Sequence, residues 1–164
     1  MAVAEWEMVE LFPVASETEI ARTKTLLEDY RKMRLLMDDY ENHTEDMQQV
    51  AIDGEVARRI DQDELHADKA ANAVLLAEKQ RWVYEQYLYR HNALLRAHSL
   101  IIDDETKQVI KYRYLQGHTM KETFLFFKRG VGDSTIKRKA KEGVISMANS
   151  LKTLCFFDND VTKF

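Results

Sequence analysis

The stretch that decides the fold is residues 119–151, TMKETFLFFKRGVGDSTIKRKAKEGVISMANSL. Its first four residues, Thr-Met-Lys-Glu, form a capping box, so a short helix is expected from here to about Phe127. A turn with two glycines follows, and Asp133 or Ser134 is expected to cap a longer helix. Two helices joined by a turn predict a helix-turn-helix, whose second helix enters the major groove of DNA.

The second helix of this stretch has an apolar face and a basic face. Apolar or small residues recur every three or four positions and are expected to face the core, namely Ile136, Ala140, Gly143, Met147 and Leu151. At about 100° per residue, Ser134, Arg138 and Lys141 then lie on the opposite side. Lys137 and Lys139 flank them. Positive charge is therefore predicted on the exposed face of the first two turns.

The residues of this basic face have distinct expected roles. Ser134 and Thr135 are expected to donate to a phosphate beside the free N–H groups of the helix start. Arg138 is predicted to contact guanine, and the lysines to neutralise phosphates. Cations on the preceding segments are expected to clamp the flanking DNA backbone, namely Arg113, Lys121, Lys128 and Arg129. The alternative is a solvated basic helix face that binds nothing.

The formal net charge of −4 conceals an uneven distribution. Residues 1–106 carry 12 Lys and Arg against 23 Asp and Glu, a net charge of −11. Residues 107–141 carry 10 basic residues against Glu122 and Asp133, a net charge of +8. The remaining 23 residues have a net charge of −1. A basic block on an acidic chain indicates a site for a polyanion.

The first hundred residues predict two long helices. Ser16-Glu17-Thr18-Glu19 is a capping box, and the three-four spacing of apolar residues continues from there to about Glu45. The polar segment Met47–Gln62 predicts a weaker helix or a connector. A second helix is expected from about Asp63 to Leu100. Its apolar stripe needs a partner, which is either the first helix or another subunit.

A further helix is predicted after Ile101, with Asp103 and Asp104 at its positive N-terminal end. Gly117 is expected to end it. Its buried side is predicted to consist of Val109, Ile110, Tyr112 and Leu115.

The composition limits the class of protein. Five Gly and one Pro in 164 residues favour an all-α chain. The single cysteine, Cys155, fits a reducing cytosol, and the acidic start of the chain, broken by Pro13, does not predict a signal peptide or a membrane span. A soluble cytoplasmic protein is expected. The acidic cluster Asp61–Asp68 is interpreted as a solvated helix start, so no metal or cofactor is predicted.

The expected architecture has two domains. Residues 1–100 form a long-helix module, a helical hairpin resembling a coiled coil, for homodimerisation or higher homo-oligomerisation. Residues 101–164 form a helix-turn-helix domain that binds double-stranded DNA. We find no Gly-rich phosphate loop, no H-E-x-x-H and no nucleophile elbow, so an enzyme is not expected.

The runs DETKQVIKYRYLQGHTMKETFLFF and GDSTIKRKAKEGVISMANSL resemble the region-4 type helix-turn-helix of sigma factors. More closely, they resemble phage-encoded transcriptional regulators of the ArpU family, and EIARTKTLLEDYRKM is similar to that family's opening helix. The pattern S-T-x-x-R-x-x-x-E-[AG]-x-x-x-x-A-x-x-L maps onto Ser134, Thr135, Arg138, Glu142, Gly143, Ala148 and Leu151.

The resemblance implies a regulator of late phage or prophage genes that acts at promoter DNA, with host RNA polymerase as a further candidate partner. Two features depart from the sigma-type pattern. Phe124 stands where that pattern has a small residue, and the turn is about two residues longer.

Two alternatives remain open. A phage small terminase subunit also joins a helix-turn-helix to oligomerising helices, and it forms a ring of many subunits. A helical adaptor binds only protein, with its basic face against an acidic partner.

Overall fold

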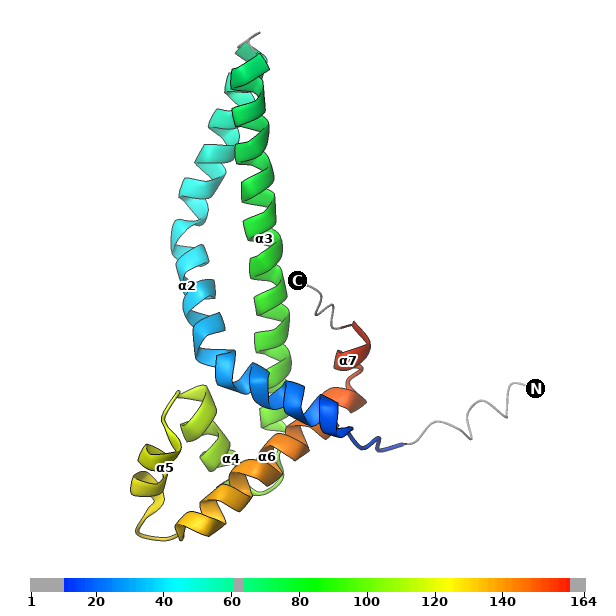
Figure 1. Cartoon of the computed structure of the whole chain (residues 1–164), viewed down its shortest axis with the longest axis vertical. Helices are drawn as coiled ribbons and strands as arrows, with labels where there is room; N and C mark the ends of the chain where they lie inside the picture. Colours follow the sequence, from blue (N-terminus) through cyan, green and yellow to red (C-terminus); the bar gives the residue numbers. More distant parts are fainter. Residues whose placement is uncertain (1–10, 61–63, 160–164) are drawn as a thin grey trace, which may run out of the picture. The chain divides into compact units, whose positions relative to one another are not determined.

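The computed structural model describes residues 11–60 and 64–159 (Figure 1). Every regular element in these two ranges is helical, which confirms the all-α prediction. None of the helices within them combines the length and apolar character needed to span a membrane. The elements are α2 (Glu17–Ile60), α3 (Glu64–Ser99), α4 (Asp104–Ile110), the π-helix η1 (Lys111–Leu115), α5 (Met120–Phe127), α6 (Asp133–Thr153) and α7 (Phe156–Asn159).

The chain divides into two compact units. Unit 1 comprises Met1–Arg31 and Asn92–Phe164, and unit 2 comprises Lys32–His91. These units differ from the predicted division at residue 100, since the start of α2 and the end of α3 belong with the C-terminal helices. The reason is burial: the core of unit 1 includes Leu27 of α2 and Leu94 of α3, both with no exposed surface.

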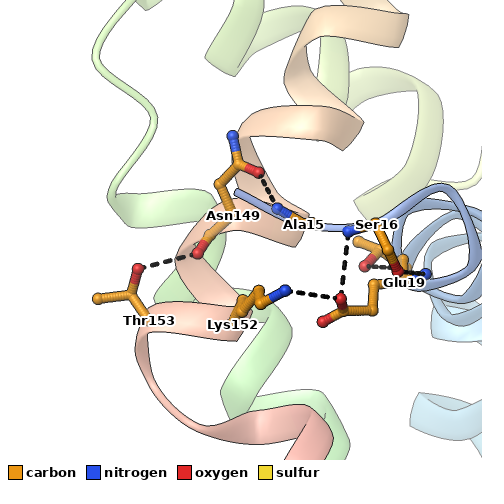
Figure 2. Close-up of polar contacts among 7 residues, drawn as sticks. Ala15, Ser16, Glu19, Asn149, Lys152 and Thr153 are labelled. Atoms are coloured by element: carbon orange, nitrogen blue, oxygen red, sulfur yellow. Dashed lines mark hydrogen bonds and ion pairs between the residues drawn. The ribbon is translucent and has the colours of Figure 1, made fainter. Parts of the chain in front are cut away.

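The start of α2 is held by the predicted capping box. The N–H of Glu19 donates to Oγ of Ser16 over 3.2 Å, and the N–H of Ser16 donates to Oε1 of Glu19 over 3.1 Å. The same Glu19 oxygen accepts from Nζ of Lys152 at the end of α6, and the N–H of Ala15 donates to Oδ1 of Asn149 (Figure 2). The residues around this cap therefore also join the start of α2 to the last turns of α6.

The two long helices are present and α2 is longer than predicted. It continues past Glu45 to Ile60, so the described part of the 47–62 segment is helical. Helix α3 begins at Glu64, next to the predicted Asp63, which lies outside the described residues.

Within unit 2, α2 and α3 run side by side in opposite directions (Figure 1). The rings of Tyr40 and Tyr84 stack with centroids 4.5 Å apart, and the Tyr84 hydroxyl donates to Glu41 over 2.6 Å. This hydrogen bond raises the pKa of Tyr84 to about 12. The arrangement confirms the predicted pair of long helices.

Helix α4 begins at an N-cap aspartate. The Asp103 carboxylate accepts from the N–H and from the hydroxyl of Thr106. The predicted burial of Val109 and Ile110 is confirmed, but Tyr112 and Leu115 are only half-buried, and Tyr114 is buried instead. The reason is the helical spacing: Tyr114 follows Ile110 by four residues and shares its buried face, whereas Tyr112 follows it by two and points away. Gly117 follows at φ +76°, the left-handed conformation expected at a helix end.

Both hydrogen bonds of the second capping box are present, between Thr119 and Glu122. The N-cap of α6 was predicted wrongly, because it is Gly132 and not Asp133 or Ser134. The extended backbone of Gly132 lets its carbonyl accept from the N–H of Ile136, which makes Asp133 the first helical residue. There its carboxylate meets the positive end of the helix dipole.

Phe124 belongs to the core between α5 and α6. Val109, Ile136 and Ala140 form a buried cluster, and Phe124 packs against it. Three further apolar residues pack there with Phe124, namely Met120, Phe127 and Val131. The large side chain that departs from the sigma-type pattern therefore fills space between these helices.

All five residues predicted to face inward from α6 are buried. Gly143 is the point of closest approach to α4, because a Cβ added there would lie 2.6 Å from Cδ1 of Ile110 and 3.0 Å from Cγ2 of Thr106. Glycine at this position is therefore required by packing, although glycine is a poor helix former.

We predict that Gly143→Ala lowers the free energy of unfolding by about 1–3 kcal/mol, since overpacking outweighs the helix propensity gained. The matched control is Gly130→Ala, where an added Cβ meets nothing within 4 Å. Urea unfolding followed by circular dichroism compares the two. An increase in stability for Gly143→Ala would contradict the close approach of α4 and α6.

Candidate nucleic-acid interface

The first turns of α6 present a basic surface. Ser134, Lys137, Arg138 and Lys141 are exposed, while Thr135 is half-buried. The cations expected to flank this surface from α5 and the turn are exposed as well, namely Lys121, Lys128 and Arg129. Since the opposite side of α6 is buried, the exposed side chains of its first turns form one basic face of this helix.

The exposed cations on α6 are held only weakly. Nε of Arg138 lies 3.7 Å from a carboxylate oxygen of Glu142, and both side chains are more than half exposed. A surface pair of this kind contributes about 0–1 kcal/mol, so it leaves the guanidinium available to a ligand. Nζ of Lys137 lies 5.8 Å from the ring centroid of Phe124, so its ammonium is directed toward α5.

Lys139 is engaged elsewhere. Its ammonium lies 3.0 Å from Asp103 and 2.8 Å from Glu105, and its side chain is only 14% exposed. It joins α6 to the start of α4 and does not lie on the exposed basic face. The block 107–141 contains few acids, but acids outside this block neutralise Lys139.

Arg113 also has partners within the fold. Its Nη1 donates to the carbonyl of His118 over 2.9 Å, and its guanidinium lies 4.8 Å from the ring centroid of Tyr114. The side chain is half-buried. These contacts hold the segment after η1 in place. Arg113 therefore stabilises the fold, whereas the sequence predicted only a contact with the DNA backbone.

The electrostatics of the α4 start follow from these contacts. Hydrogen bonds from Thr106, and next the ammonium of Lys139, lower the pKa of Asp103 to about 2. Glu105 and then Asp103 raise the pKa of Lys139. The carboxylate and the ammonium are therefore both charged at neutral pH.

Our sequence prediction missed two apolar surfaces. Leu125 and Phe126 of α5 are 62% and 63% exposed. The 3.6-residue period of the helix could have predicted this exposure, because Phe124 and Phe127 face inward and the two residues between them must point away. In addition, a groove of about 720 Å³ is lined by residues 12–14, residues 100–103 and the C-terminal half of α6.

The acidic cluster Asp61–Asp68 contains Asp61 and Asp63, which lie outside the described residues, and its other side chains are likewise not described. Across the side chains that the structure does describe, no group of three or more His, Cys, Asp or Glu is placed to hold a metal ion.

We predict that Asp103→Asn reduces the loss of stability in acid. The pKa of the Asp103 carboxyl is about 2 in the folded protein, below its ordinary value of 3.8. The ionised carboxylate therefore stabilises the fold above about pH 3.8. That contribution is lost as the pH falls toward 2. Urea midpoints at pH 6 and pH 2.5 test this. The wild type should exceed Asp103→Asn at pH 6, and the difference should shrink at pH 2.5. A difference that is independent of pH would contradict the prediction.

Comparison with known proteins gives no relative. No protein-family model, curated protein or solved structure matches the chain.

Proposed function

We propose that this protein is a sequence-specific DNA-binding transcriptional regulator that recognises double-stranded DNA with the first turns of α6. The observation that carries the proposal is the division of this helix into a fully buried side and an exposed basic side. An α-helix fits the major groove, and exposed cations at its start can reach base edges and phosphates. The short α5 and the turn before α6 are consistent with a helix-turn-helix.

The contacts within the fold refine the set of residues proposed to meet DNA. Arg138 is the candidate for guanine, because its guanidinium is exposed and its partner Glu142 holds it weakly. Lys137 and Lys141 are candidates for phosphates, and Ser134 can donate beside them.

On the preceding elements, Lys121, Lys128 and Arg129 are the candidates for the flanking backbone. Lys139 and Arg113 are left out of the proposed contact set, because each has partners in the fold.

Resemblance to the ArpU family extends the proposal to activation of late phage genes, with RNA polymerase as a partner. This extension rests on the sequence pattern alone.

The central test is selection of bound sequences from a random duplex pool, followed by titration of the selected site. We expect Arg138→Ala with Lys141→Ala to weaken binding on the order of tenfold to a hundredfold, through loss of one base contact and one phosphate contact. The slope of log affinity against log salt should decrease by about 1. Lys24→Ala with Lys32→Ala is the control, because it removes two exposed cations from α2.

An equal loss of affinity in the control pair would mean that the effect comes from the change in net charge alone. If no duplex is retarded at low salt, the proposal fails and a protein-binding adaptor becomes the better interpretation.

We also propose that unit 2 mediates homodimerisation. Its two helices expose large apolar side chains that a monomer leaves in water, namely Leu35, Leu36, Ile52, Val56, Leu75 and Leu76. Burial of these residues against a second copy removes from water the apolar side chains that the pairing of α2 with α3 leaves exposed.

The mass in solution tests this part of the proposal. We expect the mass of two chains at micromolar concentration, and Leu75→Glu with Leu76→Glu should shift it toward one chain. A mass of one chain at every concentration would exclude self-association. A ring of many subunits would favour the small terminase interpretation instead.

A further inference from the structure

Three aromatic rings form a stack on the surface of unit 1, next to the proposed duplex interface. The ring of Tyr112 lies 3.9 Å from that of His118, at an interplanar angle of 14°. It lies 4.2 Å from that of Phe126, at an angle of 17°. Two rings so close and so nearly parallel to Tyr112 cannot share one of its faces without overlapping. His118 and Phe126 therefore cover opposite faces of Tyr112.

Phe126 forms an open end of this stack. One of its faces lies on Tyr112, and Phe127 meets it edge-on with centroids 5.0 Å apart. Even so, 63% of Phe126 is exposed, so the face away from Tyr112 is open to solvent. The side chain is held in place by its neighbours while an aromatic surface remains uncovered.

Four exposed cations lie close to these rings in the sequence. Among residues 11–60 and 64–159, no ion pair involves these four cations, and Glu122, which is also close in sequence, is already engaged by Thr119 and His118. The local charge therefore favours an anion. The four cations are Lys111, Lys121, Lys128 and Arg129.

We propose that Phe126 is a stacking platform for an unpaired base of a single-stranded nucleic acid, whose phosphates lie on these cations. Proteins hold single strands with flat aromatic side chains in basic surroundings, because every base has a π face that can stack on such a ring. Phe126 lies on α5 and not on the exposed face of α6, so the inference does not depend on duplex recognition by Arg138. Lys121, Lys128 and Arg129 are shared with the proposed duplex interface.

A protein partner is the competing occupant of this surface, and Leu125 distinguishes the two. Leu125 and Phe126 are adjacent and equally exposed, at 62% and 63%. An apolar partner surface would use both side chains. A base would use the flat ring alone.

The test measures binding of fluorescently labelled oligo(dT) and oligo(U) to the full chain at low salt. We expect Phe126→Leu to weaken binding by about tenfold, as loss of one stacked base does. Phe126→Trp should retain it, and Leu125→Ala should stay within about twofold of the wild type. Phe126→Leu should leave duplex affinity unchanged, whereas Arg138→Ala with Lys141→Ala should weaken duplex binding only.

A second readout does not depend on the stability of the leucine variant. In Phe126→Trp, stacking of a base should quench the added indole fluorescence, whereas in Leu125→Trp the added fluorescence should not change. The comparison of oligo(dT) with oligo(U) shows whether DNA or RNA is preferred. The proposal is overturned if neither oligonucleotide binds, if Phe126→Leu and Leu125→Ala lose affinity equally, or if both indoles are quenched alike.

Discussion

The close approach of α4 to α6 at Gly143 is the constraint on which the rest of unit 1 depends. Space for the Ile110 and Thr106 side chains exists only because residue 143 lacks a Cβ. One turn earlier, Lys139 reaches Asp103 and Glu105, and these ion pairs join the same two helices. Together these contacts fix the rotation of α6 about its own axis. That rotation decides which of its cations are exposed.

A second set of contacts closes unit 1 from the other end of the chain. Asn149 accepts from the N–H of Ala15, and Lys152 pairs with Glu19 (Figure 2). The N-terminal capping box and the last turns of α6 therefore stabilise each other across more than 130 residues of sequence. The helix that carries the proposed DNA contacts is thus held in its middle by α4 and in its last turns by the start of α2.

The cations of this region fall into two groups, those that pair within the fold and those that are exposed. Lys139 and Arg113 interact with groups inside the fold, whereas Lys137, Arg138 and Lys141 are exposed. A count of basic residues treats all five alike. The difference matters for function because a cation already paired in a partly buried position offers less to an incoming polyanion than a solvated one.

The sequence by itself determined the features that depend on residues within about one helical turn. Both capping boxes, the inward face of α6 and the all-helical class follow from spacings of three or four residues, and the structure contains each of them. The tertiary structure alone decided the pairing of Lys139 and the joining of the start of α2 to the last turns of α6. It also assembled the ring stack around Tyr112. The partners in these features come from different segments of the chain, and no local period specifies which of them meet.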